Sequence, residues 1–288
     1  MKHIIVIPVF NDWKSLNKLL SKLDKQLKNN KKIKNEVLIV NDNSLQNVKL
    51  NHKLYKSFKQ IKILSLYKNF GSQIAIAVGL NYLKNLKGDF YITVMDADGE
   101  DSPTQVNIML KAASKNKNFV ITSNRKKRKE SYLIIFLYKL HLLLTFLFTF
   151  KWITFGNFST FNRKHLNKLF LNNYSLYAHS SSILKNCSIK RLYAKREKRF
   201  FDKSKLSILA LINHSLRINS VFYRNIFFSS VFYSLIIYIF MNQFYNYLFL
   251  HIILFYNLLV LYTKVKFWKL KINSLNDYIN DVKSFRTN

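Results

Sequence analysis

The chain has 288 residues, with 47 Lys and Arg against 14 Asp and Glu, so its formal net charge is +33. A hydrophobic fraction of 49% with 16% aromatic residues excludes a disordered basic tail, and the single cysteine excludes a disulfide scaffold, a CxxC redox site and a thiolate zinc site. A folded chain this basic is expected to have an anionic partner, which is nucleic acid, phospholipid or a phosphorylated substrate.

The first part of the chain alternates short apolar runs with helical patterns. The runs are rich in β-branched residues and do not alternate with polar ones, so they predict strands buried on both faces. The expected strands are 3–8, 36–40, 61–66, 90–95 and 119–123, and the expected helices are 13–28, about 69–86 and 104–115. Strand and helix in alternation predict an α/β fold, with a mostly parallel sheet covered by helices.

Three polar motifs directly follow expected strands, at 8–12, 41–44 and 96–101. Because ligands of parallel sheets bind at the carboxyl ends of the strands, we expect the three motifs to meet at one edge. The third motif holds Asp96, Asp98, Glu100 and Asp101, four of the 14 acidic residues within six positions. In so basic a chain this cluster indicates a place that holds cations.

Asp96 and Asp98 are two residues apart at a strand end, where their carboxylates can share a divalent cation. Such a cation neutralises the diphosphate that leaves when a sugar is transferred from a nucleotide donor. A solvated acidic turn is the plain alternative, and the two companion motifs favour the functional interpretation.

The second part of the chain is strongly apolar. Segment 132–150 is long enough to span a bilayer, but Lys139 and His141 near its centre favour a helix on the membrane surface or under the catalytic domain. Segments 225–240 and 247–262 are joined by an uncharged turn and flanked by basic residues, which predicts a membrane hairpin with both ends in the cytoplasm. The N-terminus has no signal-peptide pattern.

The motifs together resemble the family 2 glycosyltransferases of the GT-A fold, and most closely their polyprenyl-phosphate branch, which includes dolichol-phosphate mannose synthases and undecaprenyl-phosphate glucosyltransferases. The matching pieces are Ile-Pro-Val-Phe-Asn at 7–11, Val-Asn-Asp-Asn-Ser at 40–44, Asn-Phe-Gly at 69–71, Met-Asp-Ala-Asp-Gly-Glu-Asp-Ser-Pro at 95–103 and the apolar hairpin. One departure is at 41–44, where the family usually has Asp-Asp-Gly-Ser and this chain has Asn-Asp-Asn-Ser.

The resemblance implies roles for the residues at the strand ends. Pro8, Asn11 and Asp42 would line the nucleotide pocket. Asp96 would contact the ribose or the diphosphate and, with Asp98, hold Mg²⁺ or Mn²⁺. Asp101 would be a second catalytic carboxylate beside Asp98, unless it is only the N-cap of the helix at 104–115.

Two basic clusters are expected to bind phosphate. Arg125 begins the first, which is otherwise a solvated run or a contact to lipid headgroups. The second, at 195–205, resembles the branch's Arg-x-x-Arg followed by Gly-x-Ser-Lys, although the Gly is absent. There the resemblance implies that Arg196, Arg199 and Lys205 bind the diphosphate or an acceptor phosphate.

The sequence therefore predicts a metal-dependent hexosyltransferase with a GT-A domain at 1–215 and a membrane hairpin with a basic cytoplasmic tail at 216–288. It would move a sugar from a nucleotide donor to a polyprenyl phosphate at the cytoplasmic face of the inner membrane, as a multi-pass protein of cell-envelope polysaccharide synthesis. A hydroxyl of a glycolipid or lipopolysaccharide is the alternative acceptor, and a non-catalytic basic protein of the membrane surface is the alternative class. Nucleic acid is not expected as a partner, and a homo-oligomer stays open.

Overall fold

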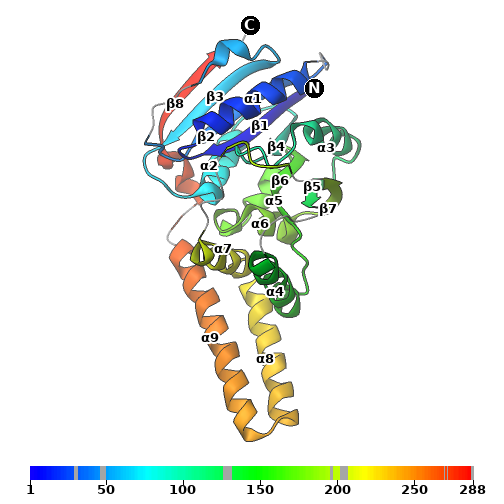
Figure 1. The fold of residues 1–288 in the computed structure, drawn as a ribbon, viewed down its shortest axis with the longest axis vertical. Helices are drawn as coiled ribbons and strands as arrows, with labels where there is room; N and C mark the ends of the chain where they lie inside the picture. Colours follow the sequence, from blue (N-terminus) through cyan, green and yellow to red (C-terminus); the bar gives the residue numbers. More distant parts are fainter. Residues whose placement is uncertain are drawn as a thin grey trace. The chain divides into compact units, whose positions relative to one another are not determined.

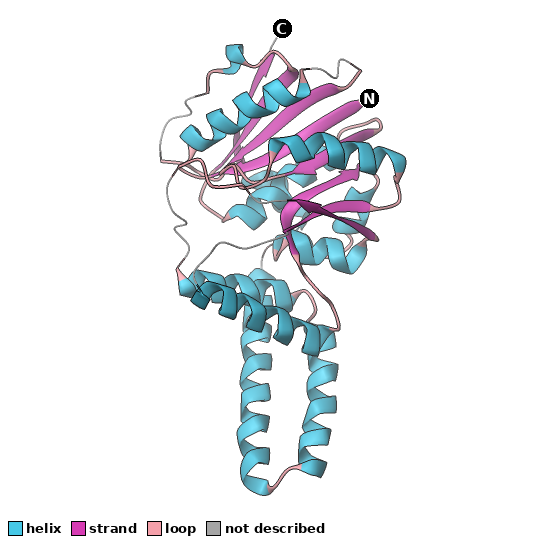
Figure 2. Ribbon diagram, turned by 45° about the vertical axis from the view of Figure 1, so that its right-hand side comes forward, coloured by secondary structure: helices cyan, strands magenta, loops and turns pink. Residues whose placement is uncertain are grey.

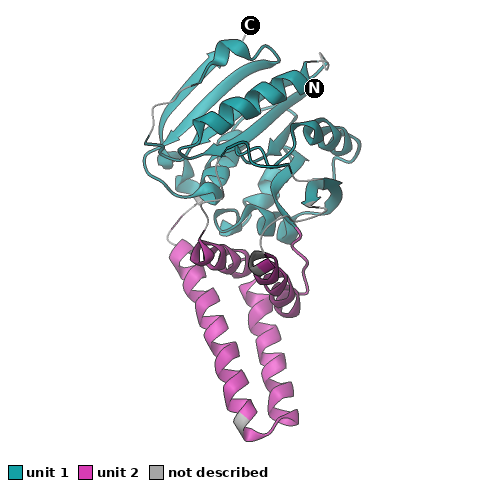
Figure 3. Cartoon of the chain, in the orientation of Figure 1, with its two compact units in different colours: residues 1–128, 155–204, 271–288 teal, residues 129–154, 205–270 magenta. Residues whose placement is uncertain are grey.

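The computed structural model describes residues 1–28, 32–45, 50–125, 132–194, 197–201, 207–268, 270 and 272–286. The chain divides into two compact units (Figure 3). Unit 1 comprises residues 1–128, 155–204 and 271–288, and unit 2 comprises residues 129–154 and 205–270. The expected boundary at 215 is thus not where the units divide, because segment 132–150 groups with the apolar helices and the C-terminal tail groups with the sheet.

Unit 1 is built on an eight-stranded sheet with the order β7-β5-β6-β4-β1-β2-β3-β8 (Figure 1). The strands are β1 (Lys2–Val9), β2 (Lys34–Asn41), β3 (Phe58–Leu66), β4 (Phe90–Val94), β5 (Val120–Arg125), β6 (Phe155–Asn162), β7 (Ile189–Ala194) and β8 (Ile279–Arg286). The central strands β4, β1, β2 and β3 run parallel, while β6 pairs antiparallel with both β4 and β5. The α/β class is confirmed.

Helices cover both faces of this sheet (Figure 2). They are α1 (Trp13–Leu27), α2 (Ser72–Lys84), α3 (Pro103–Lys115), α5 (His165–Leu169) and α6 (His179–Asn186), with short 3₁₀ turns η1 (His52–Leu54), η2 (Asn173–Leu176) and η3 (Ile272–Tyr278). Alternate side chains of β1 point to opposite faces of the sheet. On one face Ile5 and Ile7 pack against the leucines of α1. On the other face a Cβ at Gly79 of α2 would lie 3.1 Å from Val6 and 2.8 Å from Val40, so only glycine permits this close approach.

The C-terminal tail forms the edge strand β8, antiparallel to β3. The sequence predicts a basic tail there and no strand. Most side chains of β8 are exposed, so its sequence carries no apolar run, and the backbone hydrogen bonds to β3 hold it instead. Two side-chain contacts add to this pairing, a 2.7 Å hydrogen bond from Gln60 Nε2 to Ser284 Oγ and a stack of Phe285 on His52.

Unit 2 consists of α4 (Tyr132–Thr149), α7 (Ile208–Ser220), α8 (Tyr223–Phe240) and α9 (Gln243–Trp268). A small core of Phe148, Ile226 and Val260 joins α4, α8 and α9. Among the residues that the structure describes, two helical stretches are long and apolar enough to cross a membrane, Tyr223–Phe240 and Tyr245–Phe267. They contain the predicted segments 225–240 and 247–262 completely, and most of their residues are not buried within the protein.

Candidate functional site

The three strand-end motifs lie at one edge of the sheet. The register pairs Pro8 of β1 with Val40 of β2, and Val6 of β1 with Val94 of β4. Since these strands run parallel, the residues that follow each of them emerge at the same edge. This places 8–12, 41–44 and 96–101 together, as the sequence analysis expected.

Asn11 and Ser44 tie the first two motifs to each other. The backbone N–H of Asn11 donates to Ser44 Oγ at 2.9 Å, and Asn11 Oδ1 accepts from the backbone N–H of Leu45 at 2.8 Å. Asn11 adopts a left-handed backbone conformation with φ of 51°, which asparagine tolerates better than most residues. Pro8 is buried in β1 beneath this turn. Asn11 and Pro8 therefore shape the surface at this edge of the sheet.

Asp42 uses both of its carboxylate oxygens to hold the loop that precedes α2. Oδ1 accepts from the backbone N–H of Phe70 and Oδ2 from that of Gly71, each at 2.8 Å. The side chain is buried, and burial raises its pKa while these two hydrogen bonds oppose the rise. Asp42 in this structure therefore fixes the shape of the pocket wall through the backbone.

The acidic turn after β4 is held together by its own carboxylates. The backbone N–H of Asp96 donates to Asp101 Oδ2 at 3.1 Å, and that of Glu100 donates to Asp98 Oδ1 at 3.0 Å. Gly99 provides the required φ of +85°. The N-cap of α3 is Ser102, with Pro103 following it, so Asp101 is not the helix cap and instead ties down the start of the turn.

Residues 197–201 lie across this acidic turn. Two backbone bonds of 3.0 Å dock them, from the N–H of Glu197 to the carbonyl of Glu100 and from the N–H of Phe200 to the carbonyl of Asp98. The ring of Phe200 packs directly on Gly99, where a Cβ would overlap the ring. On α1 the ammonium groups of three lysines face the rings of Phe200 and Phe201 at 4.3–5.1 Å; they belong to Lys14, Lys18 and Lys22.

Arg199, in this segment, forms an ion pair with Asp98. Its Nη2 and Nε lie 2.6 and 3.1 Å from Asp98 Oδ2, and Nε lies 3.9 Å from Glu100 Oε1. Arg196 and Lys205, predicted as its partners in phosphate binding, lie outside the described residues, and for Arg125 only the backbone, at the end of β5, is described. Of the four predicted basic residues, Arg199 is therefore the one whose side chain the structure places beside the acidic turn.

Two residues that were not selected from the sequence are linked to this turn, Asn157 directly and Gln73 through Asn157. Asn157 of β6 donates from Nδ2 to Asp96 Oδ1 at 3.0 Å, and Gln73 of α2 donates from Nε2 to Asn157 Oδ1 at the same distance. No periodicity or motif connects positions 73, 96 and 157. The antiparallel pairing of β6 with β4 brings Asn157 to Asp96.

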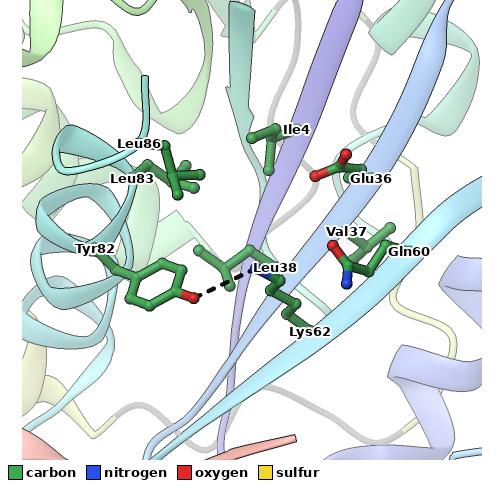
Figure 4. A pocket seen from close by; sticks show the side chains of 9 residues that line it. All are labelled: Ile4, Glu36, Val37, Leu38, Gln60, Lys62, Tyr82, Leu83 and Leu86. Carbon is green, nitrogen blue, oxygen red and sulfur yellow. Dashed lines mark hydrogen bonds between the residues drawn. The ribbon is translucent and has the colours of Figure 1, made fainter. Parts of the chain in front are cut away.

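A pocket opens between the acidic turn and β6. Its lining residues are Asp96, Glu100, Asp101, Ser102, Ser123, Asn124, Gly156, Asn157, Phe158 and Ala194. The three carboxylates on one wall face polar amides and hydroxyls on the other, which suits a hydroxyl-rich ligand. A second pocket, lined by residues such as Ile4, Glu36 and Tyr82, lies beside α2 near the starts of the strands, far along them from the acidic turn (Figure 4).

The donor set at the acidic turn fits a divalent cation bound together with a substrate. Within the part of the chain that the structure describes, no three His, Cys, Asp or Glu side chains are arranged to hold a metal by themselves. Mg²⁺ is usually bound by one or two carboxylates plus substrate phosphates, and Asp96 and Asp98 supply that number. The guanidinium of Arg199 already places positive charge against Asp98.

Comparison with known proteins identifies the family. The sequence profile described as "Glycosyl transferase family 2" matches residues 4–183, which is more than half of the chain. The chain belongs to glycosyl transferase family 2. Two curated relatives are the uncharacterized glycosyltransferases sll0501 of Synechocystis, 32% identical over 129 residues, and YkcC of Bacillus subtilis, 28% identical over 135 residues. These matches cover 44% and 46% of this chain and only 39% and 40% of the relatives.

Solved structures share the GT-A-type fold at low sequence identity. Glucosyl-3-phosphoglycerate synthase from Mycobacterium tuberculosis, in complex with Mn²⁺, UDP-glucose and phosphoglyceric acid, superposes with a TM-score of 0.53 at 12% identity, covering 78% of this chain and 79% of that one. TarS 1–349 of S. aureus in complex with UDP-GlcNAc superposes with a TM-score of 0.51 at 17% identity, covering 80% and 70%. At these identities the similarity shows the fold.

Proposed function

We propose that this chain transfers a glycosyl residue from a nucleotide sugar to a polyprenyl phosphate at the surface of a membrane. The observation that carries the proposal is the acidic turn of Asp96 and Asp98, at the carboxyl edge of the sheet, with the Arg199 guanidinium against it. Carboxylates for a cation and an arginine for phosphate are the groups that a diphosphate leaving group and a phosphate acceptor require. Family membership and neighbours bound to UDP-sugars support the donor class.

In this reaction an oxygen of the acceptor phosphate forms a bond to the anomeric carbon as the bond from that carbon to the nucleoside diphosphate breaks. The acceptor phosphate is ionised near neutral pH, so no strong base is needed, and catalysis depends on positioning and on stabilising charge. A divalent cation, when bound, would neutralise the diphosphate. Asp96 and Asp98 would hold it, Arg199 would bind phosphate oxygens, and the turn built by Asn11 and Asp42 would shape the nucleotide wall.

Chain connectivity supports the membrane part of the proposal. Unit 1 is one folded sheet, so all of it must lie on one side of a bilayer. The chain leaves unit 1 after residue 204 and returns at 271, and therefore crosses an even number of times in between. α7, with 13 residues, is about 20 Å long and too short for a span of roughly 30 Å. Zero crossings would also be an even number, so it is the length and apolar surface of α8 and α9 that support two, and we propose these helices as the crossings.

The same connectivity supports the proposal that α4 does not cross. The chain leaves unit 1 after residue 128, forms α4 and is back in unit 1 at 155, so this lone helix starts and ends on one side. It nevertheless exposes a row of large apolar side chains at helical spacing: Tyr132, Phe136, Leu140, Leu143 and Leu147. We infer that α4 lies in the plane of the membrane surface, which keeps this row out of water without a crossing.

A glycolipid hydroxyl is the second candidate acceptor. Asp101 and Glu100 line the pocket beside Asp96, and a hydroxyl acceptor needs such a carboxylate as general base. In the structure Asp101 Oδ2 already accepts from the backbone of Asp96, which favours a positioning role and with it the phosphate acceptor.

The acceptor is tested with the purified chain, Mn²⁺ and a panel of labelled nucleotide sugars. Undecaprenyl phosphate is expected to yield an acid-labile glycosyl phospholipid, whereas undecaprenol without the phosphate yields none. Arg196→Ala and Arg199→Ala are expected to raise the acceptor KM or lower kcat with little change in nucleotide affinity. Equal use of undecaprenol, or elongation of a preformed glycolipid alone, would replace this proposal with the hydroxyl acceptor.

A further inference from the structure

Three hydrogen bonds run from the start of α6 to Asp96 through two side-chain amides. The backbone N–H of His179 donates to Gln73 Oε1 at 2.8 Å. Gln73 Nε2 donates to Asn157 Oδ1 at 3.0 Å, and Asn157 Nδ2 donates to Asp96 Oδ1 at 3.0 Å. We call this series the amide relay. It joins α6, α2, β6 and the acidic turn, which are far apart in the sequence.

The direction of the amide relay is set at its first bond. A backbone N–H is only a donor, so Gln73 must turn its oxygen toward His179 and its NH₂ group toward Asn157. Asn157 must then accept from Gln73 with its oxygen and present its own NH₂ group to Asp96. The orientation of both amides follows from this fixed donor.

Burial makes this direction consequential. Gln73 is 4% exposed and His179 is 2% exposed, so bulk water does not replace a bond that is lost at this end of the amide relay. A reversed amide at Asn157 would bring its oxygen against the Asp96 carboxylate, and two acceptors that face each other in this half-buried place without a proton between them repel.

We propose that Gln73 and Asn157 are positioning residues for glycosyl transfer, whose amide relay presents an N–H to Asp96 Oδ1 and so orients this carboxylate toward the donor and its divalent cation. The inference rests on the proposed function, which gives Asp96 that role. Gln73 itself touches neither Asp96 nor the strand-end motifs by any hydrogen bond in the relay, so it acts only through Asn157.

The charged groups around the amide relay are few. His179 is the titratable residue whose backbone the Gln73 amide contacts; burial lowers its pKa to about 3, and its Nε2 hydrogen-bonds Ser159, so it stays neutral near pH 7. At the other end, Asp98, Glu100 and Asp101 lie beside Asp96 in the acidic turn, and Arg199 of the segment 197–201 pairs with Asp98. The native residues at positions 73 and 157 carry no charge at any pH.

The test is Gln73→Glu, which keeps the size of the side chain. When the introduced carboxyl group is protonated, its O–H can donate to Asn157 as the native amide does. When that group is ionised, both of its oxygens accept, so Asn157 must turn its NH₂ group toward position 73 and its oxygen toward Asp96. Mn²⁺ binding to the full-length chain is measured by electron paramagnetic resonance from pH 5.5 to 8.5.

Because position 73 is 4% exposed, burial should raise the pKa of the introduced carboxyl group well above its usual value and into the range of the titration. We therefore expect Gln73→Glu to bind Mn²⁺ like the native chain at the acid end. At the alkaline end it should bind about ten- to a hundredfold more weakly, because a hydrogen bond to a charged group is lost. The loss should reverse when the pH is lowered again, which shows that the fold is intact. Gln73→Met is the matched control: it removes donor and acceptor alike, so a smaller loss without this pH dependence is expected.

The outcomes separate the two proposals. If the native chain binds no Mn²⁺, the proposed metal site fails, and this inference fails with it. If the native chain binds Mn²⁺ and Gln73→Glu binds it equally well at every pH, the amide relay alone is wrong. A loss in Gln73→Met as large as that in Gln73→Glu would also overturn it, since the direction of the hydrogen bonds would then have no effect.

Discussion

Arg199 pairs with Asp98 at the position where the sequence predicts a ligand of a divalent cation. Two nitrogens of the guanidinium approach one oxygen of the carboxylate, at 2.6 and 3.1 Å. A cation that takes this oxygen as a ligand must displace the guanidinium, so the two positive groups compete for one carboxylate. Once displaced, Arg199 is close enough to the acidic turn to bind phosphate oxygens of the donor or acceptor.

This competition predicts that Arg199→Ala strengthens Mn²⁺ binding and weakens the binding of the acceptor. Mn²⁺ affinity without donor should rise, by several-fold because the side chains of Arg199 and Asp98 are 31% and 12% exposed and solvent weakens their pairing. The acceptor KM should rise as well, since a phosphate contact is lost. Lys198→Ala, which removes the same charge from an exposed neighbouring position, is the control and should change neither value appreciably. Weaker Mn²⁺ binding in Arg199→Ala would contradict the competition.

Asp98→Asn is expected to abolish glycosyl transfer, because an amide is a poorer ligand for Mg²⁺ or Mn²⁺ than a carboxylate and no longer pairs with Arg199. Thermal unfolding should show that the variant stays folded. The control is Asp281→Asn, which removes the same charge from the exposed edge strand β8, outside the acidic turn, and should keep full activity. Full activity of the native chain in excess EDTA would show that transfer needs no divalent cation and would contradict the metal role of Asp98.

Gly99→Ala is expected to destabilise unit 1 for two separable reasons. The positive φ costs an alanine about 1–2 kcal/mol, and the new Cβ overlaps the ring of Phe200. Adding Phe200→Ala should relieve the overlap and leave the backbone cost. The loss of stability in the double variant, measured by thermal unfolding, should therefore be smaller than the sum of the losses in the two single variants. Additive values would mean that residues 197–201 do not rest on the turn in solution.

The membrane topology predicts the side from which introduced cysteines react. The native Cys187 is first replaced by Ser, although burial raises the pKa of its thiol to about 11 and should make it unreactive. Met241→Cys, between α8 and α9, should then react only with an impermeant thiol reagent applied from the side opposite unit 1. Lys151→Cys, just after α4, should react from the side of unit 1. Labelling of both positions from one side would contradict the hairpin.

Stability is expected to fall as the pH drops below about 6.5. His3 is buried between Asn35 and Thr93, and burial lowers its pKa to about 4. Between pH 6.5 and about 4, the histidine therefore binds a proton in the unfolded chain and stays neutral in the folded chain. In this range each pH unit of acidification lowers the free energy of unfolding by roughly 1.4 kcal/mol for such a histidine. His3→Gln should flatten this dependence. Denaturant unfolding at pH 7.5, 6.0 and 5.0 measures it.

The sequence alone determined the central strands and the edge at which the chemistry lies. β1, β2 and β4 are apolar runs that can be recognised directly, because strands buried on both faces need no polar residues. The polar motifs that follow them had to meet at one edge because parallel strands end together. The two apolar helices were also visible, since length and hydropathy are local properties of a segment.

The tertiary structure decided which polar groups meet. Arg199 reaches Asp98 across 101 positions and Asn157 reaches Asp96 across 61, and no local pattern encodes either contact. β8 was invisible because an exposed edge strand is held by backbone hydrogen bonds to β3 and needs no apolar run. Hydrophobic burial leaves a periodic trace in a sequence, whereas a directed hydrogen bond between distant side chains leaves none until the backbone has brought them together.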